Sequence, residues 1–283
     1  MFIADAQAHI WAPNSPARPW VAAREPHRKT ALGAEELLRL MDEAGVARTV
    51  LIPPSWDADR NDLVLAAAQR YPQRFAAMGR FDLEAPEAAE RVKTWCDQPG
   101  MFGFRISFSM PRWAAALEEN RVDWLWRAAE DAQVRIALMV SQAQLPLVDK
   151  VAARFPALKL VICHLALPTE EKDEAAFRDF DNILPLARRP NVMVKVSALP
   201  AYTSAPYPFL PLHPYLRKIY DAYGPRRMFW GTDLARMPCS YRQAIDFFMQ
   251  EIPWFSADDK AWIMGRGLCE WLGWPLPKAE ISA

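Results

Sequence analysis

The chain has 283 residues, of which 52% are hydrophobic, and its 34 basic residues balance its 34 acidic residues. This length suits one large domain, and the balanced charge offers no basic field for a nucleic-acid partner. No apolar run reaches the roughly 18 residues of a transmembrane helix, and the opening MFIADAQAHIW lacks the basic start of a signal peptide. The four scattered cysteines form no CxxC pair. We therefore expect a cytoplasmic single domain over residues 1–283, without membrane partners.

Short β-rich runs alternate along the chain with amphipathic helical stretches, as a parallel sheet requires. The predicted strands are 2–9, 48–53, 75–81, 101–107, 134–140, 159–164, 192–197 and 228–233. The predicted helices are 34–44, 62–71, 85–96, 124–132, 145–155, 174–187, 213–223 and 241–251. Eight strands, each followed by a helix, favour a single-domain α/β fold, the (β/α)8 TIM barrel. An open doubly wound sheet is the alternative, which the lack of a glycine-rich phosphate loop weakens.

Three predicted connections are longer than the rest, and each follows a strand: 10–33, 107–120 and 198–212. In a barrel they lie at the rim where the strands end, which is where barrel enzymes do their chemistry. The last one is rich in Pro and Tyr, and we expect it to be a preformed lid. The aromatic content of these loops hints at a ligand more apolar than a simple sugar lactone.

Polar residues at the ends of three predicted strands form a candidate site. Strict alternation puts Asp5, Gln7 and His9 on one face of the first strand, and we expect that face to be the barrel interior. The small or apolar residues between them would then face the outer helices. His164 ends the sixth strand and Asp233 ends the eighth. Two histidines and a carboxylate that converge from different strands are typical of hydrolytic sites.

Several ordered motifs resemble those of the amidohydrolase superfamily of TIM barrels, in the branch of the sugar-lactone and 2-pyrone-4,6-dicarboxylate lactonases. DAQAHIW at 5–11 resembles its D-x-H-x-H signature, and VICHLALP at 161–168 resembles its D-H-x-x-x-P segment. MVKVSAL at 193–199 and RMFWGTDLARMP at 227–238 resemble its K-x-S and G-[ST]-D signatures. The resemblance covers essentially the whole chain.

The resemblance implies a hydrolase that opens a lactone or related cyclic ester of a sugar acid or a ring-cleavage dicarboxylate. It implies that Asp233 activates water, while His9 and His164 polarise the carbonyl, orient the water or bind a metal. Gln7 stands where the family has a histidine, and Cys163 where it has an aspartate. An amide is a poor zinc ligand, so we favour a site without a cofactor, in which Gln7 donates to the oxyanion. A single zinc or manganese ion held by His9, His164 and Asp233 is the alternative.

Other residues near the predicted rim are candidate substrate contacts. Arg105 and Arg236 could hold a substrate carboxylate or lactone oxygen through the planar guanidinium. The candidates by position are Ser107, Gln142, Tyr202 and Trp11, followed by Ser141 and His27. For the buried Lys195 we expect an ion pair with Asp5 or another internal acid.

Two other functions stay open. The resembled superfamily also contains metal-dependent non-oxidative decarboxylases of aromatic carboxylic acids. The replacements at Gln7 and Cys163 would also permit a catalytically altered barrel that only binds a ligand. In every case the expected partner is a small cyclic molecule, and assembly into a homo-oligomer is open.

Overall fold

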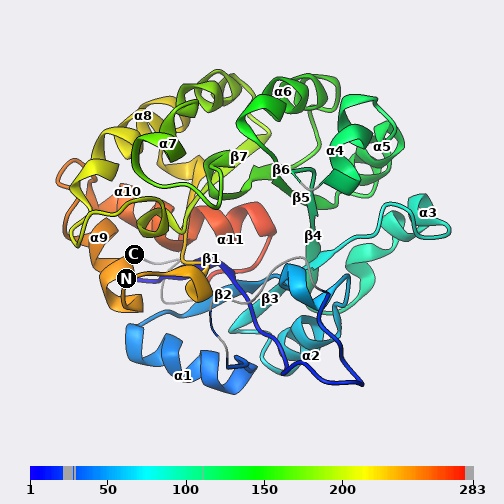
Figure 1. Ribbon diagram of the computed structural model, residues 1–283, viewed down its shortest axis with the longest axis horizontal. Helices are drawn as coiled ribbons and strands as arrows, with labels where there is room; N and C mark the ends of the chain where they lie inside the picture. The colour runs from blue at the N-terminus through cyan, green and yellow to red at the C-terminus, as the bar shows by residue number, and fades with distance from the viewer. Residues whose placement is uncertain (22–27, 29, 110, 278–283) are drawn as a thin grey trace.

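The computed structural model describes residues 1–21, 28, 30–109 and 111–277. Eight parallel strands form one sheet in the order β1 to β8, with helices around its outer face (Figure 1). The strands are β1 Ala4–Ala8, β2 Arg48–Leu51, β3 Phe75–Arg80, β4 Met101–Ser107, β5 Arg135–Met139, β6 Leu160–Ile162, β7 Val192–Ser197 and β8 Met228–Gly231. The α-helices are α1 Ala34–Ala44, α2 Asp62–Arg70, α3 Ala88–Lys93, α4 Pro111–Glu118, α5 Asp123–Asp131, α6 Leu145–Arg154, α7 Asp173–Phe177, α8 His213–Tyr223, α9 Tyr241–Met249, α10 Ala257–Ala261 and α11 Gly267–Leu272. The predicted (β/α)8 barrel is confirmed.

One predicted helix was wrong. The helix predicted at 174–187 is instead the short α7 followed by a 3-10 segment, Phe180–Arg188. Pro185 lies inside that segment and has no N–H to donate to an α-helical ladder. The long connection predicted at 107–120 contains the short helix α4.

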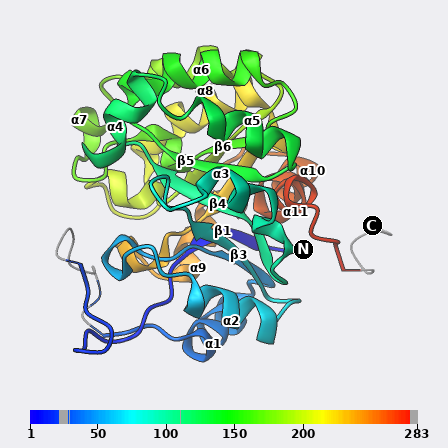
Figure 2. The ribbon, with the colours of Figure 1, turned by 90° about the vertical axis from the view of Figure 1, so that its right-hand side faces the viewer.

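Apolar side chains fill the barrel interior at the end where the strands begin. This cluster includes Ala4, Ala6, Val50, Ala76, Ala137, Val161 and Phe229. Trp271 of α11 closes this end, with its ring 5.7 Å from the ring of Phe229. Figure 2 shows α11 beside the N-terminus, at the same end of the barrel. The opposite end, where the strands finish, is thereby left for polar residues.

The first strand departs from strict alternation. Its pairing with β2 shifts between Asp5 and Ala8, so β1 holds one extra residue, a β-bulge. Ala6 faces the barrel interior, whereas Asp5 faces the outer side and contacts Tyr241 of α9. Gln7 then turns inward directly after Ala6. The expectation that Asp5 faces inward and Ala6 outward was wrong, because the bulge resets the alternation.

The buried Asp5 carboxylate joins β1 to β8, where the barrel closes. Its Oδ1 accepts hydrogen bonds of 2.9 Å from the backbone N–H groups of Gln7 and Thr232. Its Oδ2 accepts from the hydroxyls of Thr232 and Tyr241. Gly231 makes room for this contact, since a Cβ there would lie 3.1 Å from Oδ1. Burial raises the pKa of Asp5, against the effect of these four hydrogen bonds.

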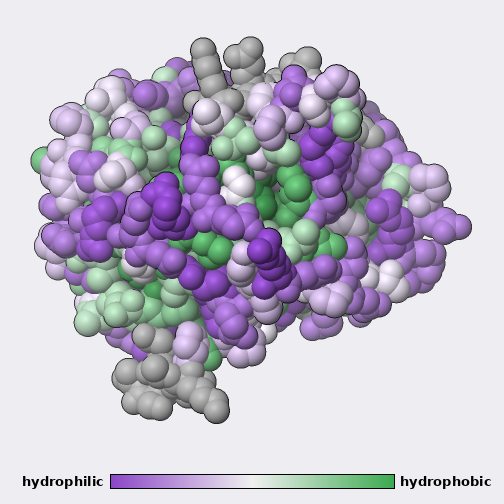
Figure 3. Space-filling view, turned by 90° about the horizontal axis from the view of Figure 1, so that it is seen from below, coloured by the Kyte–Doolittle hydropathy of each residue, from purple (hydrophilic) through white to green (hydrophobic). Residues whose placement is uncertain are grey.

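The outer helices are short. Within the described ranges, none is long and apolar enough to cross a membrane. The flank seen in Figure 3 is mostly hydrophilic, and hydrophobic residues gather in a hollow near its centre.

We predict that Asp5→Asn lowers the free energy of unfolding by about 1–3 kcal/mol, because its amide N–H2 would face hydrogen-bond donors. Urea unfolding followed by tryptophan fluorescence measures the change. The control is Asp221→Asn, which removes an exposed ion pair with Arg217 and should cost less than about 1 kcal/mol. Equal stability of Asp5→Asn and the unaltered protein would show that the contact between β1 and β8 does not depend on this carboxylate.

Candidate active site

A cavity of about 600 Å³ lies at the end of the barrel where the strands finish. The predicted site residues that line it are Gln7, His9, Arg105, Ser107, Ser141, Gln142, His164, Asp233 and Arg236. No described residue of 198–212 lines it, so this segment is not the predicted lid. The cavity therefore brings together side chains from β1 and β4 and from the segments after β1, β2, β4, β5, β6 and β8.

His164 and Asp233 reach the cavity through turns, not through strand alternation. Strand β6 ends at Ile162 and β8 ends at Gly231, each two residues before the functional side chain. Both His164 and Asp233 have a φ of 50°, in the left-handed region that is unfavourable for residues other than glycine. Such backbone strain persists where the surroundings enforce it, and it clusters at functional sites.

His9 and Asp233 face each other across the catalytic side of the cavity. His9 Nδ1 lies 2.6 Å from the carbonyl oxygen of Ile52, which can only accept, so Nδ1 carries a hydrogen. His9 Nε2 lies 3.0 Å from Asp233 Oδ1. The edge of the His9 ring therefore faces the Asp233 carboxylate. The contact is short but not aligned as a hydrogen bond, and Oδ1 has no hydrogen-bond partner in the described part of the chain.

The second histidine is held by Gln7 and Ser197. Gln7 Nε2 lies 2.9 Å from His164 Nε2, and the amide nitrogen can only donate. His164 Nε2 is therefore the acceptor, and its Nδ1–H donates to Ser197 Oγ at 2.8 Å. The neutral ring thus has a defined tautomer, with its lone pair engaged by Gln7.

The free edge of the Asp233 carboxylate faces the cavity between two other groups. Oδ2 lies 3.7 Å from His164 Nε2 and 3.7 Å from a guanidinium nitrogen of Arg236. Burial raises the pKa of Asp233, but the neighbouring His9 and Arg236 outweigh it and hold the pKa well below its usual range. Burial and nearby cations lower the pKa of His164 to about 3, against the attraction of Asp233. Near neutral pH the site therefore holds an ionised carboxylate beside a neutral imidazole.

Arg236 is itself anchored by the protein. Its guanidinium donates to the carbonyl oxygen of Thr169 at 2.9 Å and to the hydroxyl of Tyr202 at 3.3 Å. Tyr202 is fully buried and supports Arg236 from behind, without lining the cavity. Trp11 also does not line it. Instead, Trp11 packs edge-on at 5.3 Å against Trp56, which does.

Lys195 makes a contact that the sequence did not predict. Its ammonium group donates to Gln7 Oε1 at 3.3 Å. The expected ion pair with Asp5 is absent, because the Asp5 carboxylate is on the outer side of β1 and already accepts from Thr232 and Tyr241. The predicted His27 lies outside the described residues.

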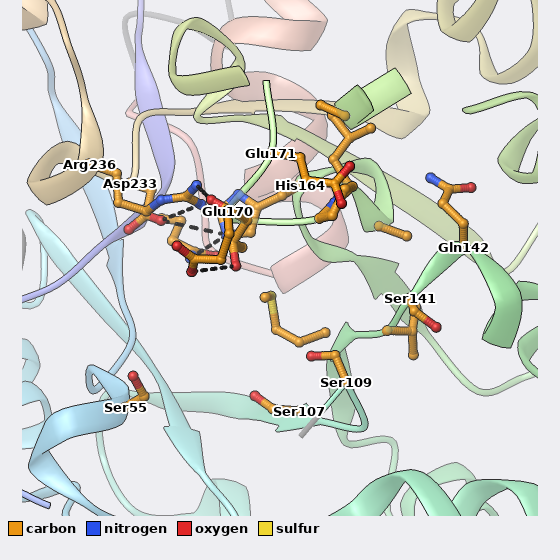
Figure 4. Close-up of a pocket in the computed structure, with 18 of the residues that line it drawn as sticks. Ser55, Ser107, Ser109, Ser141, Gln142, His164, Glu170, Glu171, Asp233 and Arg236 are labelled. Atoms are coloured by element: carbon orange, nitrogen blue, oxygen red, sulfur yellow. Dashed lines mark hydrogen bonds and ion pairs between the residues drawn. The ribbon is translucent and has the colours of Figure 1, made fainter. Parts of the chain in front are cut away.

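Hydroxyl groups line the wall opposite the catalytic side. In Figure 4, Ser55, Ser107, Ser109 and Ser141 lie across the cavity from Asp233. The side-chain hydroxyls of the first three make no hydrogen bond to any residue within 1–21, 28, 30–109 and 111–277. Sequence reasoning missed Ser55, Trp56 and Ser109, although the first two follow a predicted strand directly and that position was an available signal.

The donor set supplies too few free ligands for a catalytic metal ion. His9 Nε2 and Asp233 Oδ1 are spaced as two ligands of one ion could be. The third candidate, His164 Nε2, is occupied by the Gln7 amide. Catalytic zinc takes three protein ligands, and the described residues contain no cluster of three or more His, Cys, Asp or Glu arranged to hold a metal. The residues therefore do not fit the alternative ligand set of His9, His164 and Asp233.

Known proteins share this architecture. L-fucono-1,5-lactonase from Burkholderia ambifaria is 28% identical over 241 residues, which cover 82% of this chain and 80% of that protein. An amidohydrolase from Burkholderia multivorans, crystallised with bound HEPES, aligns over 97% of this chain and 100% of its own with a TM-score of 0.80 and 22% identity. A crystal of that amidohydrolase in another space group contains bound zinc.

More distant structures share the fold alone. A probable 2-pyrone-4,6-dicarboxylic acid hydrolase from Acinetobacter baumannii aligns over 97% of this chain and 100% of its own, with a TM-score of 0.75 and 18% identity. The 5-carboxyvanillate decarboxylase from Sphingomonas paucimobilis aligns over 96% and 99%, with a TM-score of 0.66 and 16% identity. Residues 4–281 match the family model described as amidohydrolase. The chain therefore belongs to the amidohydrolase family.

Proposed function

We propose that the protein is a hydrolase that opens a lactone, with Asp233 as the base that activates water. The observation that carries this proposal is the placement of Asp233. One carboxylate oxygen is held against His9, and the other faces the cavity between His164 and Arg236. The curated lactonase relative, which shares 28% identity, and the match to the amidohydrolase family support the same reaction class.

The reaction can be written with the groups of the site. Asp233 Oδ2 takes a proton from water as the water oxygen attacks the ring carbonyl, which gives a tetrahedral oxyanion. The C–O bond of the ring then breaks, and the proton on Asp233 passes to the leaving oxygen, so the product is a hydroxy acid. Because neighbouring charges lower the pKa of Asp233, it is a weak base. An ester carbonyl, which is more reactive than an amide, matches such a base.

Donors around the cavity can stabilise the oxyanion. Gln7 lines the cavity and has a second amide hydrogen besides the one donated to His164. His9 lies on the same side of the cavity. Removing one such preorganised donor typically costs about 3–4 kcal/mol in the transition state. We propose that these groups replace a metal ion as the electrophile.

The lining of the cavity favours a hydroxylated lactone. The hydroxyls of Ser55, Ser107 and Ser109 can both donate to and accept from substrate hydroxyl groups. Arg105, Arg178 and Arg236 also line the cavity and could engage a carboxylate of the substrate. We propose a sugar-acid lactone in preference to a ring-cleavage dicarboxylate lactone, because the 28% identical relative is an L-fucono-1,5-lactonase and serine hydroxyls line one wall.

No observation favours the two alternative functions. A metal-dependent decarboxylase needs a third free ligand, which Gln7 blocks at His164. A barrel that only binds would not need an ionised Asp233 in a strained turn. We further propose a cytoplasmic location and a small-molecule partner, and the homo-oligomer stays a prediction.

We predict that Asp233→Asn lowers kcat at least about 100-fold, because an amide cannot take the proton from water. The assay is a panel of sugar-acid lactones, including L-fucono-1,5-lactone, together with 2-pyrone-4,6-dicarboxylate, followed by acid release with a pH indicator. Asp179→Asn removes another carboxylate that lines the cavity and should change kcat less than threefold. Near-normal hydrolysis by Asp233→Asn, with an unchanged Tm, would refute the mechanism.

We predict that kcat/KM stays constant as the pH falls from about 7 to about 5. Asp233 remains ionised because its pKa is lowered, and His164 remains neutral because its pKa is about 3. In the unfolded chain His164 would protonate near pH 6.5, so its contribution to stability declines as the pH falls from about 6.5 towards 3. Initial rates and Tm measured across this range separate the two effects. An acid limb of kcat/KM centred near pH 6.5 would contradict the assigned protonation states.

We predict that the enzyme keeps its activity after dialysis against EDTA, because His164 is not free to bind a metal. Elemental analysis should find well below one equivalent of zinc or manganese per chain, and added Zn²⁺ should not raise kcat. Activity that is lost to the chelator and restored by either metal would instead favour a metal-dependent enzyme.

A further inference from the structure

Lys195 lies beneath the cavity, and among the described residues it has no ion-pair partner. Its side chain, on β7, is fully buried. Its hydrogen bond goes to the neutral Gln7 Oε1 at 3.3 Å, and no described carboxylate lies within 4 Å of its ammonium nitrogen. Burial lowers the pKa of Lys195, while the charges of Asp5 and Asp233 favour its ammonium form. Burying a charge without a close counter-ion is costly in general, so such a group is a candidate for a functional role.

The hydrogen bonds that start at Lys195 all have the same donor-to-acceptor direction. An ammonium can only donate, so the oxygen of the Gln7 amide faces Lys195 and its nitrogen faces His164. His164 in turn donates to Ser197 Oγ. Each hydrogen bond in such a chain polarises the next one. A positive charge at the start therefore strengthens the Gln7 N–H groups as donors, including the one left for the cavity.

We propose that Lys195 is a positioning residue that orients and polarises the Gln7 amide as the oxyanion donor of this site. The proposal rests on the proposed lactone hydrolysis. Lys195 does not line the cavity and so acts through Gln7. Its charge lies in a low-dielectric interior, where it favours the negative charge that develops on the carbonyl oxygen in the transition state.

The kinetic test replaces Lys195 with methionine, which keeps much of the apolar stem and removes the charge. We expect kcat to fall about 100-fold while KM changes less than about threefold, because the interaction gains strength only in the transition state. The control is Lys159→Met. Lys159 directly precedes β6, at the opposite end of the barrel, and its loss should leave both constants unchanged.

A double-mutant cycle separates this role from a general effect on folding. Gln7→Leu should lower kcat to a similar extent, and adding Lys195→Met to it should change kcat less than about twofold, since Lys195 acts through Gln7. Independent, multiplicative losses, or a normal kcat in Lys195→Met, would overturn the proposal.

A third readout does not depend on activity. The chain has four histidines, so their ¹⁵N resonances can be resolved and His164 assigned by its loss in His164→Gln. We expect the Nδ1–H tautomer at pH 7 in the unaltered protein, and a second tautomer in Lys195→Met as the amide is released. An Nε2–H tautomer in the unaltered protein would contradict the hydrogen bonds that run from Lys195 through Gln7 to His164. That result would overturn the proposal even if Lys195→Met fails to fold.

These outcomes separate the two proposals. If the unaltered enzyme opens none of the lactones, the proposed function fails, and with it the role of Lys195. If it opens a lactone and Lys195→Met does so equally well, only the role of Lys195 fails.

Discussion

The site depends on how one carboxylate closes the barrel. Asp5 accepts hydrogen bonds from β1, from the residue after β8 and from α9, and so holds the two edges of the sheet together. Where β1 meets β8, the backbone N–H of Asp233 also donates to the carbonyl oxygen of Gln7 at 2.8 Å. The extra residue in β1 that sends Asp5 outward also turns Gln7 inward. The contacts that close the barrel thus also place the Asp233 carboxylate at the cavity.

The barrel could be predicted from the sequence because its signals are local and repeated. Each strand is a short apolar run, and each helix carries an apolar stripe that must face the sheet, so the eight repeats define the topology without any long-range information. The wrong predictions, for the helix at 174–187 and for the inward face of β1, arise where a single residue breaks the periodic pattern of hydrophobic residues. Pro185 removes a helical hydrogen bond, and the bulge after Asp5 shifts the alternation of β1 by one residue. Neither the effect of Pro185 nor the bulge changes the periodicity of the surrounding residues.

The cavity was predictable only in part, for a similar reason. A position at the end of a strand indicated His9, His164 and Asp233, even though the last two arrive through left-handed turns. The partners of these residues depend on register between strands that are distant in sequence. The pairing of Lys195 with Gln7, in place of Asp5, follows from the bulge, and Tyr202 lies behind Arg236 because the segment after β7 packs away from the cavity. Such contacts leave no local trace in the sequence.

In the proposed mechanism, two pairs of side chains share the two effects that a single metal ion often supplies, the activation of water and the polarisation of the carbonyl. A bound ion both activates water and polarises the carbonyl, so the two effects change together when the ion changes. Here Asp233, paired with His9, is assigned to the water, and Gln7, paired with Lys195, is assigned to the carbonyl oxygen. The Gln7 amide also engages the lone pair of His164 that a metal would need. In the proposed mechanism, Gln7 therefore both occupies the lone pair of a possible metal ligand and donates to the carbonyl oxygen.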